Sequence, residues 1–318
     1  MSDTPPAKRK RTTDSSPDPD TTPVRSKIWM PYGDIILQAE FTQFRVNRDV
    51  LAQNSSVFAD MLSVPLPPDE PTVEGCPIVR VTDTAEDWKL LLDVLYHPFQ
   101  DSASRPFAVV AAMLRLGSKY DIPQARNDAL SRLHFEYPAD LRAWHISNAR
   151  LTKIAAHQLE GFYPDLLNLL YECGIDSCIP TAGLHCLNSY TLDALFTGVQ
   201  RHDGTSVTLS NANKLTLAVA LERILLFQKS TLRWLDGNAV VPHKSCKSST
   251  TCTREKIVIN HMVTWETKER LDSSFLLGEW DSSWSNRLCD VCELAAREYT
   301  DVSVQKGWEL LPTFFGLP

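Results

Sequence analysis

The alternation of apolar and polar residues is most regular in the first third of the chain. In GDIILQAEFTQFRVN (residues 33–47), apolar side chains recur at every second position, which predicts two short strands that each bury one face. A strand hairpin is the simplest arrangement of such a pair. The following RDVLAQNSSVFADMLS (residues 48–63) has helical spacing, but Asn54, Ser55 and Ser56 interrupt it. We therefore expect two short helices there rather than one.

A third strand and a longer helix follow. IVRV (residues 78–81) has the composition of a strand, and Thr84 can cap a helix that starts just after it. The next apolar residues form a single stripe at helical spacing, made of Trp88, Leu91, Leu92 and Leu95. Strands and helices that are mixed in this order predict a small α+β domain.

The pattern changes after this domain. Four later segments have helical rather than alternating spacing, and no run of comparable length has the pattern of a strand. These segments are residues 139–159, 163–171, 191–199 and 215–235. The fold class expected for the whole chain is therefore α+β, with a small sheet and surrounding helices first and a mainly helical region after them.

Several spaced residues of the first domain resemble the signature of the BTB/POZ domain family. That signature has an aspartate before a strand and then F-x-V-H-R-x-x-L-A-x-x-S-x-x-F. The corresponding positions here are Asp34, Phe44, Val46, Asn47, Arg48, Leu51, Ala52, Ser55 and Phe58. Asn47 replaces the histidine of the family, which removes one buried polar anchor. LRLGSKYDI (residues 114–122) resembles the later L-x-x-A-x-K-Y segment, with Gly117 where alanine is usual.

The end of the chain also resembles fungal BTB proteins, in LCDVC (residues 288–292) and GWELLPTFFGLP (residues 307–318). We therefore expect three parts: a tail at residues 1–27, a BTB/POZ-like domain at 28–135 and a mainly helical region at 136–318.

The resemblance implies a function in protein association. BTB domains generally pair with themselves or with other proteins, so we expect a homodimer or a complex with another BTB protein. The apolar residues of the two short helices are the candidate interaction residues, namely Val50, Leu51, Val57 and Phe58. Some BTB proteins are substrate adaptors of a cullin ubiquitin ligase and carry an apolar-x-Glu motif before the third strand. Because Pro68-x-Glu70 is only a near match, the adaptor role is the alternative interpretation.

The sequence gives no support to an enzyme. The His-Glu-x-x-His motif of zinc proteases, the Gly-x-Ser-x-Gly motif of hydrolases and a glycine-rich phosphate loop do not occur in it. The eight histidines are scattered, and they suggest no catalytic arrangement with cysteine or serine. We expect a non-enzymatic protein.

Charge is distributed unevenly along the chain. The tail carries six basic and four acidic residues, so the net charge of −7 leaves −9 for the remainder. An acidic body disfavours direct nucleic-acid binding, which depends on neutralising phosphates. Five prolines before residue 24 and few large apolar residues predict a disordered tail. Its basic run of Lys8, Arg9, Lys10 and Arg11 is either a nuclear import signal or a solvated charge cluster, and it slightly favours a nuclear location.

Membrane insertion is not expected. The longest apolar run, LTLAVALERILLF, is interrupted by Glu222 and Arg223 and is shorter than the roughly 20 residues that span a bilayer. The first residues lack the apolar core of a secretory signal. The eight cysteines are therefore expected in a reducing compartment, as thiols or metal ligands.

Four of those cysteines form a candidate structural zinc site, namely Cys246, Cys252, Cys289 and Cys292. The closing Cys-x-x-Cys has the usual spacing of two ligands on one tight turn, and the first pair lies in a polar loop that would gain from a metal. His243 is a substitute ligand. In the alternative interpretation, the first pair are plain loop thiols and the second pair pack in a helix. Four thiolates would leave no open position for a catalytic water, so the zinc would be structural.

Overall fold

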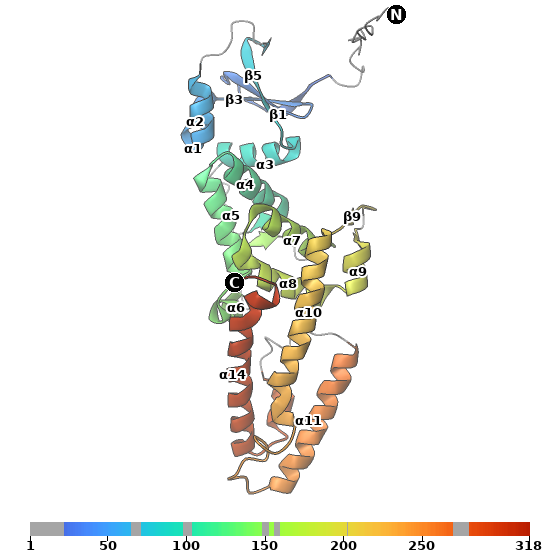
Figure 1. Ribbon diagram of the computed structural model, residues 1–318. Coiled ribbons are helices and arrows are strands. Elements are labelled where there is room, and N and C mark those ends of the chain that lie inside the picture. The colour runs from blue at the N-terminus through green and yellow to red at the C-terminus, as the bar shows by residue number, and fades with distance from the viewer. Residues whose placement is uncertain are drawn as a thin grey trace, which may run out of the picture. The chain divides into compact units, whose positions relative to one another are not determined.

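The structure is a computed structural model that describes residues 22–64, 71–97, 104–147, 153–155, 160–201, 203–269 and 280–318. The chain divides into two compact units (Figure 1). Unit 1 contains residues 1–100 and 120–122, and unit 2 contains residues 101–119 and 123–318. The α+β class expected from the sequence is confirmed, with the sheet in unit 1 and a mostly helical unit 2.

Unit 1 is built on a five-stranded sheet with the order β1-β3-β2-β5-β4. β2 and β3 form the predicted hairpin, in which Ile35 lies opposite Val46 and Ala39 lies opposite Thr42. β5 pairs parallel with β2, and β1 pairs parallel with β3. The strands are β1 (Val24–Trp29), β2 (Ile35–Ala39), β3 (Thr42–Val46), β4 (Thr72–Val73) and β5 (Cys76–Val81).

The first strand corrects one prediction. Residues 24–27 belong to β1, although we expected them in the disordered tail. β1 lies at an edge of the sheet and its first residues are mostly exposed, so it lacks the alternation that marks a half-buried strand. Residues 1–21 of the tail lie outside the described residues.

Three helices of unit 1 lie where the sequence pattern predicts them. They are α1 (Arg48–Asn54), α2 (Ser56–Ser63) and α3 (Ala85–Tyr96). Ser55 separates the first two because its Oγ accepts a hydrogen bond from the backbone N–H of Phe58 at 3.0 Å, as an N-cap residue does. Thr84 caps α3 in the same way, with 3.1 Å between its Oγ1 and the nitrogen of Asp87.

The core of unit 1 contains three aromatic rings from distant parts of the sequence. The ring centroid of Phe58 lies 5.8 Å from that of Trp88 and 5.1 Å from that of Tyr120. Tyr120 donates a hydrogen bond of 2.6 Å to Asp83, while burial and this bond raise the pKa of Tyr120. Ser55 Oγ donates to the backbone oxygen of Tyr120. The tyrosine of the LRLGSKYDI segment is therefore a core residue of unit 1.

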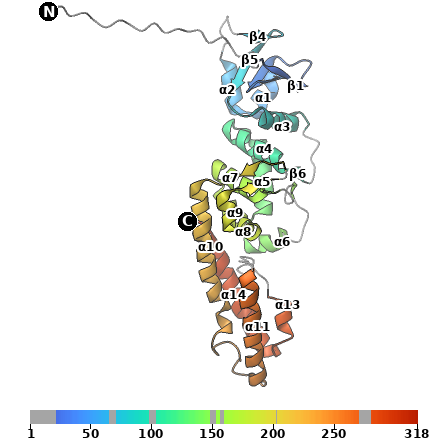
Figure 2. The same cartoon turned by 90° about the vertical axis from the view of Figure 1, so that its right-hand side faces the viewer.

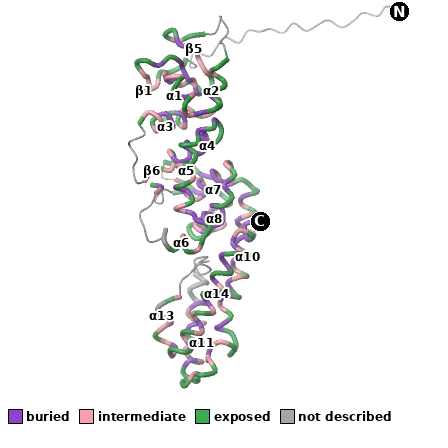
Figure 3. The backbone as a smooth tube through the Cα atoms, turned by 90° about the vertical axis from the view of Figure 1, so that its left-hand side faces the viewer, coloured by how far each residue is buried: buried purple, intermediate pink, exposed green. Residues whose placement is uncertain are grey.

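Unit 2 is mainly helical. Its helices are α4 (Phe107–Lys119), α5 (Pro123–Glu136), α6 (Leu141–Ser147), α7 (Phe162–Cys173), α8 (Ile179–Ser189), α9 (Leu192–Thr197), α10 (Asn211–Thr231), α11 (Ser249–Glu269), α13 (Ser282–Ser285) and α14 (Asp290–Phe314), with 3-10 turns η1 (Asp176–Cys178) and η2 (Leu232–Leu235). The helices predicted at residues 163–171 and 215–235 are confirmed as α7 and as α10 with η2. Buried positions recur along α7 and α8 (Figure 3).

Two of the predicted helices are shorter than expected. Within the described part of residues 139–159, only α6 is helical, and Ile154–Ala155 is the strand β7, which pairs with β6 (Arg105–Pro106). The helix predicted at residues 191–199 ends at Thr197, and Val199–Gln200 is the strand β8. None of the helices in the described ranges is long and apolar enough to cross a membrane.

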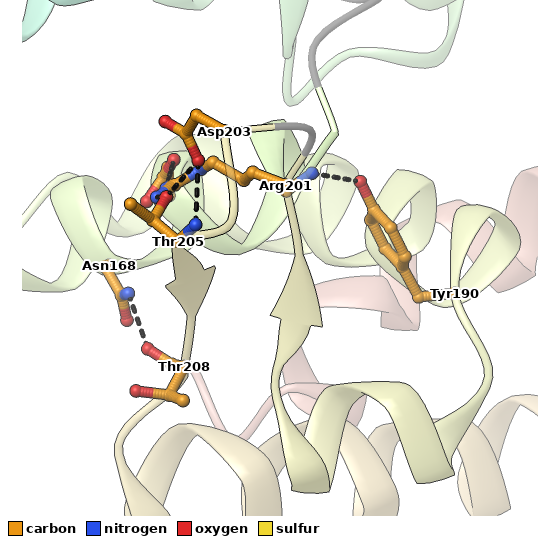
Figure 4. Close-up of polar contacts among 8 residues, drawn as sticks. Asn168, Tyr190, Arg201, Asp203, Thr205 and Thr208 are labelled. Atoms are coloured by element: carbon orange, nitrogen blue, oxygen red, sulfur yellow. Dashed lines mark hydrogen bonds and ion pairs between the residues drawn. The ribbon is translucent and has the colours of Figure 1, made fainter.

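A small hairpin is fixed to α7 by polar contacts (Figure 4). β8 pairs antiparallel with β9 (Ser206–Val207), and Arg201 between them forms an ion pair with Asp165 of α7. Asn168 Nδ2, also on α7, donates to the backbone oxygen of Thr208 at 3.0 Å. These polar contacts add to the burial of Val199 and Val207, one in each strand of the hairpin.

Candidate functional site: a four-cysteine cluster

Four cysteines of unit 2 converge on one point, although the helix α11 separates the two pairs in the sequence. Cys246 lies in the loop before α11, and Cys252 lies in the first turn of α11. Cys289 is the N-cap residue of α14, and Cys292 lies in its first turn. The N-terminal ends of α11 and α14 are thus brought to the same end of a helical bundle that also contains α10 (Figures 1 and 2).

The sulfur atoms have the spacing of a metal site. All four lie within 4.8 Å of one another. Cys246 Sγ lies 3.7 Å from Cys252 Sγ and 3.6 Å from Cys289 Sγ. Four sulfurs at about 2.3 Å from a central zinc would lie about 3.8 Å from each other, whereas a disulfide requires about 2.05 Å. The predicted convergence of these residues is confirmed, and the cluster could bind a metal.

Backbone N–H groups donate to the sulfur atoms of Cys246, Cys252 and Cys292. Ser248 donates to Cys246 at 3.4 Å, Cys289 donates to Cys252 at 3.5 Å, and His243 donates to Cys292 at 3.3 Å. Such bonds stabilise thiolate more than neutral thiol because the acceptor carries the charge. They also orient the ligands, as outer contacts do in metal sites.

His243, the substitute ligand suggested by the sequence, contributes through its backbone instead. Its ring Nδ1 accepts a hydrogen bond of 3.2 Å from the backbone N–H of Ser245. Its backbone oxygen accepts from Cys246 at 2.8 Å, which fixes the turn that presents the first cysteine.

The ends of two helices affect the electrostatics of the cluster. The N-terminus of a helix carries a partial positive charge, which favours thiolate. The backbone N–H of Cys292 lowers the pKa of the Cys289 thiol to about 7. Burial raises the pKa of Cys292 to about 12 and also raises that of Cys252. Without a cation, the cluster would therefore keep its more buried thiols protonated, and a metal would be needed to ionise all four.

The cluster lies against a compact apolar core. Trp234 packs against Trp280 and Trp284, with ring centroids 5.6 Å and 5.9 Å away. The other buried side chains of this core are Leu235, Val241, Ile259, Val263, Leu288 and Ala296, together with Cys252 and Cys292. A metal at this point would join the loop before α11 to α14 through that core.

The residues of the BTB-like signature have defined contacts in unit 1. Asp34 Oδ1 accepts a hydrogen bond of 2.8 Å from the backbone N–H of Arg48, so this aspartate caps the start of α1. Asn47 Nδ2 donates to the backbone oxygen of Tyr32 at 2.9 Å, and its Oδ1 accepts from the hydroxyl of Tyr96 at 3.3 Å. The expected loss of a polar anchor at Asn47 is therefore wrong, because the asparagine side chain is itself hydrogen-bonded on both sides.

The predicted interaction residues fall into two groups. Leu51 and Phe58 are 1% and 0% exposed, so they belong to the core of unit 1 and are not accessible to a partner, which corrects that part of the prediction. Val50 is half-buried and Val57 is 40% exposed, and their contact with a partner stays a prediction. The sequence reasoning missed Met61 and Val64, which are 41% and 63% exposed at the end of α2. Helical spacing alone does not tell which side of so short a helix faces the core.

Two other predicted features lie outside the described residues. They are the basic run Lys8, Arg9, Lys10 and Arg11 and the near match Pro68-x-Glu70.

Unit 1, with its mixed sheet, paired short helices and capping aspartate, is a small α+β domain. A comparison with family models is more specific. Residues 29–134 match the BTB/POZ domain, so the chain contains a BTB/POZ domain, and the matched residues include α4 and α5 of unit 2. BTB/POZ domains are protein-interaction domains and are generally non-enzymatic. A search among curated proteins finds no match to the chain.

Proposed function

We propose that the protein acts by association through its BTB/POZ domain, first of all with a second copy of itself. The family match at residues 29–134 carries this proposal. The exposed apolar side chains of α2 support it, because Val57, Met61 and Val64 lie close together in the sequence and expose apolar surface at one helix. A symmetric dimer would bury the same surface of both copies.

Sedimentation of the full chain tests self-association. We expect a dimer at tens of micromolar and a shift towards monomer for Val57→Asp combined with Met61→Asp, because two charges would then be buried in the interface. Val302→Asp is the matched control, since Val302 is a 71% exposed valine in unit 2. A wild-type chain that sediments only as a monomer would count against the proposal.

The alternative is a substrate adaptor for a cullin ubiquitin ligase. It rests on the domain family and on the near match Pro68-x-Glu70. Affinity capture of the tagged chain that recovers a cullin, and loses it when Glu70 is replaced by Ala, would favour the adaptor. A stable dimer that recovers no cullin would favour a scaffold or regulator.

A nuclear location is the second part of the scaffold proposal. It rests on Lys8, Arg9, Lys10 and Arg11 alone. Replacing the four residues with alanine should move a fluorescently tagged chain out of the nucleus. A distribution that does not change would identify the run as a solvated charge cluster.

We further propose that the four-cysteine cluster holds one structural zinc ion. Sulfur distances near 3.7 Å, backbone N–H donors to sulfur and two helix N-termini support this ligand set. Four protein thiolates complete a tetrahedral shell, so the ion would stabilise the fold and would not activate water.

Metal analysis of chelator-free protein should find about one zinc per chain. Cys289→Ser should lose that zinc, whereas Cys173→Ser, a half-buried cysteine outside the cluster, should retain it. Circular dichroism would verify that both variants are folded. Wild-type protein that contains iron, or no metal, would contradict the zinc assignment.

A further inference from the structure

Lys256 is a buried lysine in the same core region as the four cysteines. It is only 4% exposed, although lysine side chains are rarely buried without a partner of opposite charge. Its Nζ donates to the backbone oxygen of Val241 at 2.8 Å, to Asn238 Oδ1 at 3.3 Å and to the backbone oxygen of Gly237. These three acceptors are neutral oxygens, so none of them carries a full negative charge that would balance the charge of the ammonium group.

The position of Lys256 connects it to the cluster in two ways. It follows Cys252 by four residues on α11, and residues at this spacing lie on the same face of a helix. The residues that it holds, 237–241, lead directly into His243 and Cys246. His243 donates its backbone N–H to Cys292, and Cys246 has the sulfur that approaches both Cys252 and Cys289.

The negative charge of a zinc-filled site would add to that of Asp236 in balancing the positive charge of Lys256. A zinc ion with four thiolates carries a net charge of −2, and burying such a charge is unfavourable unless a cation lies nearby. Burial lowers the pKa of Lys256, while the charge of Asp236 raises it. Glu255, the preceding residue on α11, does not supply a partner for Lys256, because it forms ion pairs with Arg287 at 3.1 Å and with Arg254 at 3.2 Å.

We propose that Lys256 is a positioning residue of the metal site, which holds residues 237–241, the segment that leads into the ligand loop, and offsets the negative charge of the zinc tetrathiolate. The inference rests on the zinc site proposed above and extends it to a residue that is not a ligand.

Four variants of the full chain test this role. Lys256→Gln keeps hydrogen-bond donors without the charge, Lys256→Met removes both, and Lys256→Arg keeps the charge. Lys247→Met is the matched control because Lys247 is exposed and directly follows Cys246. Zinc affinity would be measured by competition with a chromogenic chelator, and cobalt substitution would report the thiolate-to-metal absorption bands.

We expect Lys256→Met and Lys256→Gln to bind zinc about 10- to 100-fold more weakly, the usual effect of losing an outer contact of a metal site. Lys256→Arg should recover most of the affinity, and Lys247→Met should bind like the wild type. Zinc binding by Lys256→Gln or Lys256→Met as tight as that of the wild type would overturn the proposal.

Melting temperatures separate this role from a general contribution to folding. If Lys256 acts towards the metal, the zinc-dependent rise in melting temperature should become smaller in Lys256→Met. A purely structural lysine would lower the melting temperatures of the zinc-bound and zinc-free chains equally, and that result would also overturn the proposal. Wild-type chain that binds no zinc would instead refute the metal site itself, and with it the role of Lys256.

Discussion

Gly117 lets two helices approach more closely than an alanine would allow. A Cβ atom at this position would lie 2.9 Å from the backbone nitrogen of Arg126, so α4 and α5 would have to separate. The departure from the family signature, which usually has alanine here, is thus matched by the local packing of this chain.

The first prediction concerns this contact. Gly117→Ala should destabilise the protein by about 1–2 kcal/mol, because the cost of overpacking outweighs the better helix propensity of alanine. Chemical denaturation would measure the change. Ser118→Ala, at an exposed position of the same helix, should be neutral or slightly stabilising. A Gly117→Ala protein as stable as the wild type would show that the two helices can move apart at no cost.

Phe58 and Val57 are adjacent but have different roles. Phe58 packs against Trp88 and Tyr120 in the core of unit 1, so Phe58→Ala should cost about 3–5 kcal/mol and unfold the unit. Val57 is 40% exposed, and Val57→Ala should change stability by less than about 0.5 kcal/mol. Equilibrium unfolding monitored by tryptophan fluorescence would compare them. Equal losses for the two variants would mean that Val57 is also a core residue.

At the scale of elements, the end of α14 depends on a side chain from α10. Arg223 Nη1 donates to the backbone oxygens of Thr313 at 2.6 Å and of Phe314 at 3.2 Å, which satisfies carbonyl groups that a helix C-terminus leaves without partners. The positive charge also interacts favourably with the helix dipole.

Arg223→Ala should therefore destabilise unit 2 by about 1–2 kcal/mol. This loss is smaller than that for a buried charged hydrogen bond, because water screens the exposed guanidinium group. High salt should reduce the difference from the wild type, since salt screens the charge. Thermal unfolding at two salt concentrations would measure both effects. Lys306→Ala, at an exposed position within α14, is the control and should change little.

Elements with a local pattern could be predicted from the sequence, and elements without one could not. Alternation located β2 and β3, and helical spacing located α1, α2, α3, α7 and α10. The two-residue strands β4 and β6 to β9 are too short to have a period. α8 was missed because it is buried on nearly all sides, and a helix without a polar face lacks the amphipathic signal.

The cysteine cluster could be proposed because its ligand type and closing spacing are local features. The hydrogen bonds and the buried lysine around the cluster could not be predicted from the sequence. The N–H donors of Ser248 and His243 depend on loop conformation, and a lysine within a helix normally indicates an exposed position, so the burial of Lys256 has no signature in the sequence.

At the scale of the whole molecule, the end of the BTB/POZ family match does not coincide with the boundary between the two compact units. The family match ends at residue 134, whereas α4 and α5 belong to unit 2. Within that unit, Arg115 of α4 forms an ion pair of 3.0 Å with Glu172 of α7, and Phe107 packs against Phe162 at 5.1 Å. A fragment that ends near residue 135 would expose these surfaces, so association is best measured on the full chain.

The last prediction is that removal of zinc affects the helices around the cysteine cluster and leaves the sheet of the BTB/POZ domain unchanged. Removal of zinc by a strong chelator should loosen the first turns of α11 and α14, because the metal is proposed to link them to the loop around Cys246. Hydrogen exchange should then become faster in those turns and stay unchanged in β2, β3 and β5. Sedimentation of the zinc-free chain should still report the oligomer of the zinc-bound chain, since the surface of α2 belongs to unit 1. Faster exchange throughout the sheet, or dissociation on zinc removal, would show that the cluster supports the BTB/POZ domain as well.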